Sequence, residues 1–228
     1  MICAILTCAG AGRRMNRKIP KAFIPLRGKP MFFYALNALR SSALFDQIIV
    51  TVPKDRLAYT TKKLKEWKIN EAAAIRGGKE RQESVYLALC QLPEETKYVL
   101  IHDGARPFVT ADLLRNTLQA ARKWGAATAA VPCTDTAKVG RNNFLHDTLN
   151  RSEIFLIQTP QAFRYDLILE AHKKARRDNF IATDDATLVE RIGHKVRIAP
   201  GNPWNIKITT PEDLRIAEIL AQRLLPEK

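Results

Sequence analysis

The stretch Ile2-Cys-Ala-Ile-Leu-Thr-Cys-Ala-Gly-Ala-Gly-Arg-Arg-Met15 begins with a short apolar run and passes directly into two glycines. A run of this length that ends at glycine is typical of a buried strand followed by a turn. Backbone N–H groups at a glycine turn approach an anion closely, and two arginines stand beside this one. We therefore expect a strand over Ile2–Thr7 and an anion-binding turn over Ala9–Met15, although a plain strand-to-helix turn also fits the spacing.

The glycine pattern excludes two common nucleotide-binding motifs. Met15 stands where the dinucleotide pattern Gly-x-Gly-x-x-Gly needs its third glycine, and the Gly-Lys-Ser/Thr of a P-loop is absent. A nicotinamide-dependent oxidoreductase is correspondingly disfavoured.

Strand and helix patterns alternate along the rest of the chain. Short β-branched runs predict strands at Ile2–Thr7, Gln47–Val52, Tyr98–Ile101, Ala126–Val131, Lys195–Ile198 and Ile206–Ile208. Amphipathic patterns predict helices at 30–44, 54–67, 80–92, 111–124, 165–177, 184–192 and 211–225. This alternation predicts an α/β fold, a three-layer sandwich with a mostly parallel sheet, whose ligands lie beyond the carboxyl ends of the strands.

One segment, at about 134–160, is polar and weakly periodic. An excursion of this length is usually functional or a subunit contact. We expect one domain over residues 1–228, with this segment leaving the core.

Positive charge is concentrated near the N-terminus. Lys and Arg number 37 against 23 Asp and Glu, a net charge of +14, and no acidic residue precedes Asp46. The basic run is consistent with a solvated face or an anionic partner. A nucleic-acid-binding module would interleave aromatic residues, and Phe23 alone lies near the run, so we expect a small polyphosphate and no nucleic acid.

The four cysteines show no metal-binding spacing and are expected to be reduced. The first apolar stretch, Ile2–Leu6, is too short for a signal core, and no run approaches a membrane span. We expect a cytoplasmic protein without a membrane partner.

Two further residues have the chemistry of phosphate transfer. Lys21 follows Pro20 in a rigid segment and could converge with Arg14, a pair that would stabilise negative charge on a transferring phosphate, although a surface lysine also fits. Asp103 ends a strand beside Gly104, where a carboxylate suits a Mg²⁺ ion that bridges nucleotide phosphates or simply caps the next turn.

The whole chain resembles the 2-C-methyl-D-erythritol 4-phosphate cytidylyltransferase family of the non-mevalonate isoprenoid pathway. The matching blocks, in order, are Ala9–Met15, Pro20-Lys21, Gly77–Ser84, His102–Pro107, Asp135-Thr136, Asn150-Arg151, Thr159–Gln161, Thr183-Asp184 and Asn205–Asp213.

The resemblance implies a Rossmann-like nucleotidyltransferase sandwich that joins CTP to the polyol phosphate in the presence of Mg²⁺. It implies that four residues are catalytic: Arg14, Lys21, Arg151 and Lys207. It implies that CTP is bound by Cys8, Ala9, Gly10, Gly12, Arg14, Lys21, Gly77, Gly78, Arg81, Ser84, Asp103 and Gly104. The polyol phosphate would contact Asp103, Arg106, Thr136, Arg151, Thr159, Thr183 and Lys207, and Asp103 would hold the metal. The excursion would be a dimerisation arm that brings Thr136 and Arg151 to the active site of the partner in a homodimer.

Two positions depart from the family pattern: Cys8, which we expect to be sensitive to thiol reagents, and Trp204, where an acidic residue is common. A ribitol 5-phosphate cytidylyltransferase shares the CTP motifs and is the nearest alternative.

Overall fold

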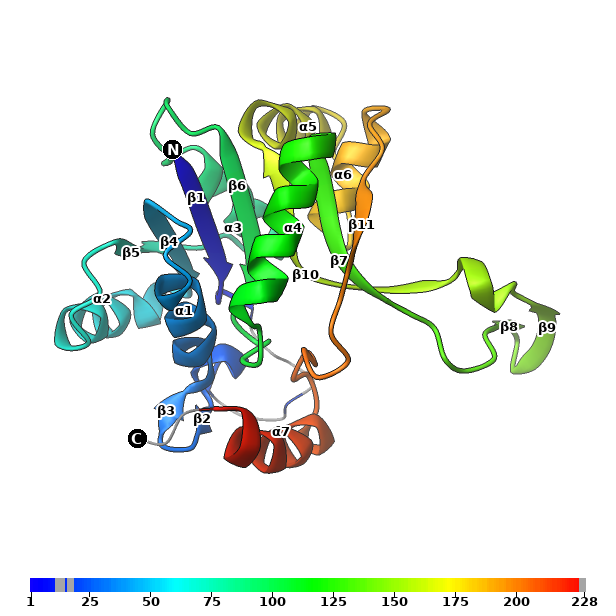
Figure 1. Ribbon diagram of the computed structural model, residues 1–228, viewed down its shortest axis with the longest axis horizontal. Helices are drawn as coiled ribbons and strands as arrows, with labels where there is room; N and C mark the ends of the chain where they lie inside the picture. Colours follow the sequence, from blue (N-terminus) through cyan, green and yellow to red (C-terminus); the bar gives the residue numbers. More distant parts are fainter. Residues whose placement is uncertain (11–14, 16–18, 226–228) are drawn as a thin grey trace.

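A seven-stranded sheet forms the centre of the protein in the computed structural model, which describes residues 1–10, 15 and 19–225. Its strands run in the order β11-β7-β10-β6-β1-β4-β5 (Figure 1). Their bounds are β1 (Ile2–Thr7), β4 (Gln47–Val52), β5 (Ala72–Arg76), β6 (Tyr98–Asp103), β7 (Ala126–Pro132), β10 (Phe155–Arg164) and β11 (Arg197–Pro200). All pairings are parallel except those of β10, which is antiparallel to both of its neighbours, β6 and β7. The predicted α/β fold with a mostly parallel sheet is confirmed.

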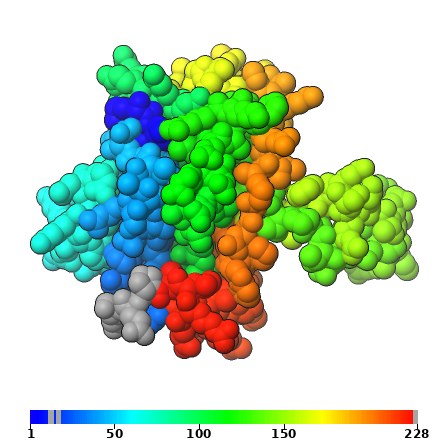
Figure 2. Space-filling model, in the orientation of Figure 1, coloured from blue at the N-terminus to red at the C-terminus, as the bar shows by residue number. Residues whose placement is uncertain are grey.

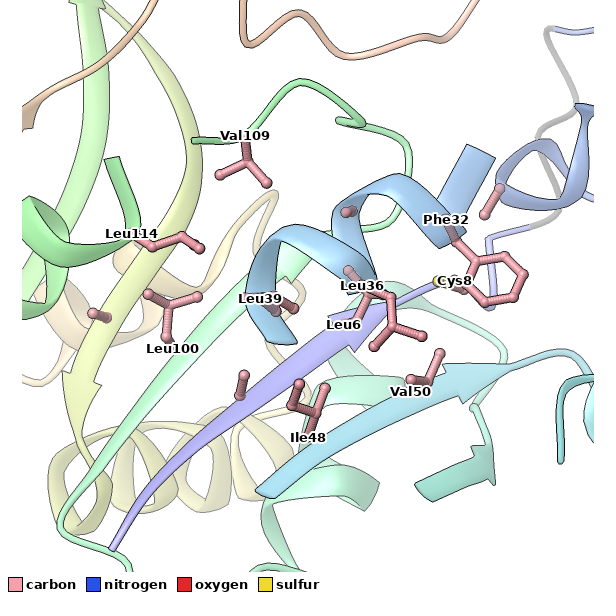
Figure 3. Close-up of a cluster of buried hydrophobic side chains, with 14 of the residues drawn as sticks. Leu6, Cys8, Phe32, Leu36, Leu39, Ile48, Val50, Leu100, Val109 and Leu114 are labelled. Atoms are coloured by element: carbon pink, nitrogen blue, oxygen red, sulfur yellow. The ribbon is translucent and has the colours of Figure 1, made fainter. Parts of the chain in front are cut away.

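Helices cover both faces of the sheet because successive side chains of a strand point to opposite faces. Ala4 and Leu6 of β1 pack with one set of helices, and Cys3 and Ile5 pack with the other. Figure 3 shows Leu6 beside Leu36 and Leu39 of the first set. The first set is α1 (Met31–Ser41), α2 (Leu57–Glu66) and α4 (Ala111–Trp124), and the second is α3 (Arg81–Leu89), α5 (Tyr165–Arg177) and α6 (Asp185–Arg191). These four β1 side chains are fully buried, which explains the continuous apolar run in the sequence.

A smaller cluster closes the carboxyl end of the sheet. It joins α7 (Pro211–Leu224) to the short strand β2 (Pro25–Leu26), which pairs with β3 (Lys29–Pro30), and Ile208 and Phe108 are buried in the same cluster. Thr210 and Asp213 form a capping box at the start of α7. Two short 3-10 turns, η2 (Lys21–Phe23) and η3 (Lys54–Arg56), precede β2 and α2 respectively.

A hairpin projects from the body of the molecule between β7 and β10 (Figures 1 and 2). It contains β8 (Lys138–Arg141), β9 (Phe144–Thr148) and the 3-10 turn η4 (Arg151–Glu153). We call residues 133–154 the arm. Phe144 and Leu145 at its tip are each 74% exposed.

The predicted strands at Ile2–Thr7 and Gln47–Val52 and the predicted helices at 111–124 and 165–177 are confirmed residue by residue. Two predictions were wrong, and one strand was missed. Ile206–Ile208 is not a strand, because Ile208 N–H donates to Ala105 O outside any ladder. The excursion predicted at about 134–160 is too long, because the sheet strand β10 already begins at Phe155. Strand β5 was missed because its run of alanines gives no strand pattern.

No helix in the described part of the chain has the length and apolar character that crossing a membrane requires.

Candidate active site

The site lies where β1 and β6 end side by side at the carboxyl edge of the sheet. Thr7 and Asp103 are register partners, and the Thr7 hydroxyl donates to Asp103 Oδ1 at 3.1 Å. A cavity of about 170 Å³ opens at this point, and we call it the first cavity. Its lining is Thr7, Cys8, Ala9, Gly10, Lys21, Ala22, Arg81, Ser84, Asp103, Ala105 and Lys207.

Asp103 forms the centre of a charged cluster. Arg81 Nε donates to its Oδ1 at 2.9 Å, and Lys207 Nζ lies 2.6 Å from its Oδ2. Burial opposes ionisation of this carboxyl, but the charges of Arg81, Lys207 and Arg106 outweigh that penalty and hold the pKa of Asp103 well below its ordinary value. Asp103 is therefore an anion at neutral pH that holds two cations at the mouth of the strands.

A second cavity of about 290 Å³ shares Arg81, Asp103 and Lys207 with the first. Its other lining residues are Arg106, Ile157, Gln158, Thr159, Gln161, Thr183, Asp184 and Thr187. Arg106 is fixed there because its Nη1 donates to Asn205 O at 2.7 Å. The two cavities thus adjoin at one charged wall, which is an arrangement suited to two ligands that react with each other.

Backbone and side-chain hydrogen bonds hold Asp103 from behind. Asp103 N–H donates to the Thr159 hydroxyl at 3.0 Å, and that hydroxyl lies 3.1 Å from His102 Nδ1. His102 Nε2 lies 3.1 Å from Arg106 O, and burial lowers the pKa of His102 to about 4. The neutral ring therefore donates from Nε2 and accepts the Thr159 proton at Nδ1. The Thr159 hydroxyl is already used within the protein, so it positions Asp103.

Two glycines allow the loops of the site to approach one another. A Cβ on Gly77 would collide with the side chains of Ala9 and Ser84, and one on Gly104 would collide with Cys8 Sγ. Gly78 N–H donates to Ser84 Oγ at 3.0 Å. Gly77 and Gly78 therefore pack behind the first cavity and do not line it.

The structure brings most of the predicted residues together. The first cavity contains Cys8, Ala9, Gly10, Lys21, Arg81, Ser84, Asp103 and Lys207, and the second adds Arg106, Thr159 and Thr183. Gly12 and Arg14 lie outside the described residues. Thr136 and Arg151 are exposed on the arm, and neither lines these cavities; Arg151 Nη1 donates to Thr134 O at 2.9 Å.

Sequence reasoning missed several polar residues that support the site, among them His102, Gln161, Asp185 and Asn205. All four are buried. His102 and Gln161 interrupt apolar strands, and a buried polar side chain needs a hydrogen-bonding partner, so their positions were a usable signal.

The acidic residues in the cavity linings indicate which kind of metal ion the site could hold. No three His, Cys, Asp or Glu side chains form a metal-binding group in the described part of the chain. Asp103 is the single acidic residue in the described lining of the first cavity. One carboxylate fits an ion that takes its other ligands from phosphates and water, as Mg²⁺ does.

Trp204 does not line either cavity. It is 57% exposed and lines a separate hollow with Tyr34 and Phe108. Asp103 is therefore the carboxylate of the described lining of the first cavity, and position 204 adds nothing to that lining.

The fold and the site define a class of α/β protein that binds phosphorylated ligands at the carboxyl edge of a parallel sheet, in two adjoining cavities. The model of the 2-C-methyl-D-erythritol 4-phosphate cytidylyltransferase family matches residues 2–223. The chain belongs to this family.

Relatives and solved structures of the same description cover nearly the whole chain. The cytidylyltransferase of Clostridium novyi is 43% identical over 225 residues, covering 97% of both chains, and that of Pelotomaculum thermopropionicum is 44% identical over 220 residues, covering 95% and 92%. The crystal structure of 4-diphosphocytidyl-2C-methyl-D-erythritol synthase from Anaerococcus prevotii superposes with a TM-score of 0.86 at 32% identity, covering 97% of this chain and 98% of that one. The Thermus thermophilus cytidylyltransferase gives 0.81 at 34% identity, covering 96% and 98%.

Cys8 is predicted to resist thiol reagents, contrary to the expectation from its position beside the glycine turn. Burial, with Asp103 nearby, raises the pKa of the Cys8 thiol well above its ordinary value, and the side chain is 1% exposed. Cys90 is exposed and serves as the internal control. Timed iodoacetamide labelling, read by peptide mass spectrometry, should modify Cys90 at least about tenfold faster than Cys8. Equal rates in the native protein would contradict the buried placement.

Proposed function

We propose that this chain transfers a cytidylyl group from CTP to 2-C-methyl-D-erythritol 4-phosphate, giving 4-diphosphocytidyl-2-C-methyl-D-erythritol and pyrophosphate. The family match supports the reaction, and one observation of the structure carries its assignment to this site. Two cavities share a wall made by Arg81, Asp103 and Lys207, so a nucleotide in one and an acceptor phosphate in the other meet at fixed cations. The family match does not favour ribitol 5-phosphate as the acceptor.

The glycine-rich first cavity suits the nucleotide, and the second suits the acceptor. Lys21 lines the first cavity, while Arg106 and the threonine side chains line the second. Lys207 lines both and is ion-paired to Asp103 at 2.6 Å, so it can contact the acceptor phosphate and the reacting α-phosphate. Fixed cations at this position stabilise the charge that develops during nucleotidyl transfer.

A single in-line displacement fits the described lining better than a covalent enzyme intermediate. The Cys8 thiol is buried with a raised pKa, and the Ser84 hydroxyl donates to Glu80 O at 3.0 Å, so neither is activated by a neighbouring base. The acceptor phosphate is itself the nucleophile in this proposal.

We further propose that Mg²⁺ accompanies CTP and is held by Asp103. When bound, the ion would neutralise charge on the triphosphate and so assist the departure of pyrophosphate. Asp103 Oδ2 is paired with Lys207 Nζ at 2.6 Å, so a carboxylate that held the ion would release part of this pairing and leave the Lys207 ammonium available to a substrate phosphate.

The acceptor is tested by pyrophosphate release. CTP, Mg²⁺ and 2-C-methyl-D-erythritol 4-phosphate together should release pyrophosphate, while ribitol 5-phosphate as acceptor, or ATP, GTP or UTP as donor, should give at most a few per cent of that rate. Release from CTP with ribitol 5-phosphate but not with 2-C-methyl-D-erythritol 4-phosphate would overturn the proposed acceptor and leave the proposed CTP site standing. No release with either acceptor would overturn the proposed reaction.

A homodimer is proposed because the arm carries an exposed apolar surface and two of the predicted site residues. Phe144 and Leu145 are each 74% exposed, and Leu156 next to the arm is 55% exposed. Contiguous exposed apolar side chains of this kind mark interaction surfaces. In a dimer formed through the arms, Thr136 and Arg151 of one chain would reach the cavities of the other chain. Within a single chain, neither residue lines the described cavities.

Mixed dimers test that exchange. Arg151→Ala and Lys207→Ala should each lose most activity, because both cations contact substrate in the assembled site. Unfolding the two variants together and refolding them at equal concentration should restore about one quarter of wild-type activity, since half of the dimers are mixed and each has one intact site. Each variant refolded alone is the control. No recovery in mixtures that contain mixed dimers would show that Arg151 acts within its own chain.

We also propose a cytoplasmic location. All four cysteines are free, as expected in a reducing compartment. The absence of a nucleic-acid partner stays a prediction.

A further inference from the structure

The guanidinium of Arg81, at the start of α3, is stretched between two carboxylates. Its Nε donates to Asp103 Oδ1 at 2.9 Å, and its Nη1 donates to Asp185 Oδ2 at 2.6 Å. Asp103 lines both cavities, whereas Asp185 is not part of either lining. The third nitrogen, Nη2, is buried and has no hydrogen-bonding partner among the described residues.

Asp185 is a buried anion outside the cavities. It is 1% exposed, and its second oxygen, Oδ1, lies 3.1 Å from His172 Nε2. Burial opposes its ionisation, yet Arg81 and His172 lower the pKa of Asp185 below its ordinary value. Because Oδ1 belongs to an ionised carboxylate, His172 Nε2 carries the proton and donates to it.

His172 is itself fixed by packing. It lies on α5, is completely buried, and its ring stacks on Tyr86 at a centroid distance of 6.3 Å. The guanidinium of Arg176 also packs on the Tyr86 ring, 4.3 Å from its centroid. The imidazole therefore has little freedom to follow Asp185 if that carboxylate moves.

The backbone of Asp185 is held from β10. Gln161 Oε1 accepts from the N–H groups of Asp185 and Ala186 at 3.1 and 3.3 Å, while its Nε2 donates to Asp184 Oδ2 at 2.7 Å. Asp185 thus has a fixed backbone, one oxygen bound to α5 and the other to Arg81.

Burying a carboxylate and two cationic or polar partners gives little net stability, since apolar side chains of the same volume are often as stable. What this arrangement does supply is geometry: two anchored oxygens fix the plane of the Arg81 guanidinium. We infer that Asp185 and His172 are positioning residues that act through Arg81, fixing the orientation of its guanidinium at the wall shared by the two cavities. This inference rests on the proposed function of those cavities.

Four variants test the relay in the full-length protein. Asp185→Asn cannot accept from both Arg81 and His172 Nε2–H in the same way, and His172→Leu removes the donor. Both should lower kcat/KM for CTP and the acceptor about tenfold or more. His172→Gln retains an N–H donor and should recover most of that loss. Ile168→Ala is the matched control: it removes a fully buried apolar side chain one turn before His172 on the same helix but none of the hydrogen bonds of the relay, so its Tm should fall while its KM values stay unchanged.

A double-mutant cycle distinguishes positioning from a general structural role. If Asp185 acts through Arg81, adding Asp185→Asn to Arg81→Ala should cause no further loss of kcat/KM beyond that of Arg81→Ala alone. If the losses of kcat/KM in the two single variants multiply in the double variant, the inference is overturned. It is also overturned if KM shifts as much in Ile168→Ala as in Asp185→Asn.

One readout is independent of turnover. Hydrogen exchange at the Arg81 Nη1–H that donates to Asp185, followed by NMR, should be slow in the wild type and in Ile168→Ala and fast in Asp185→Asn and His172→Leu. A wild type without turnover but with this exchange pattern would contradict the proposed function and support the positioning of Arg81. Unchanged exchange in Asp185→Asn would overturn the positioning, even in an enzyme that is active.

Discussion

The ion pairs between Asp103, Arg81 and Lys207 are the interaction on which the arrangement of the site depends. Asp103 ends β6, Arg81 begins α3, and Lys207 lies in the irregular segment before α7, so the three residues join parts of the chain that are distant in sequence. A buried carboxylate is costly without such partners, and two cations without the carboxylate would repel each other across the cavity wall. Each charge is therefore tolerated because of the others, and the cluster holds the two cavities against one another.

The central sheet could be predicted because its strands are buried on both faces. β1 and β4 appear in the sequence as continuous apolar runs, and the pattern located them to the residue. β10 escaped because Gln158, Thr159 and Gln161 interrupt its apolar character, although all three are buried and hydrogen-bonded. Ile206–Ile208 shows the opposite error. Its alternation reflects side chains that face the cluster under α7 and the site in turn, without a strand partner.

Lys21 and Asp103 could be singled out from their sequence context, although a surface lysine and a turn cap also fitted there. The family resemblance assigned roles to both and added Arg81 and Lys207; these four residues come from four separate segments and share the first cavity. It did not show how they are held. The Thr159 hydroxyl supports the Asp103 backbone, and Asp185 with His172 supports Arg81, because these contacts depend on how α5, α6 and β10 pack. Local sequence patterns do not encode such packing. The role of Thr136 and Arg151 on the arm depends in addition on a second chain, in the proposed dimer.

The most direct test of this account is the kinetics of Asp103→Asn with each substrate varied in turn. Asparagine keeps the shape of the side chain but cannot neutralise Arg81 and Lys207, so both sides of the shared wall should be disturbed. We predict that kcat/KM falls on the order of 100-fold for CTP and also for 2-C-methyl-D-erythritol 4-phosphate, in a protein that remains folded by circular dichroism. A loss confined to one substrate, or none, would contradict the claim that one buried carboxylate organises both cavities.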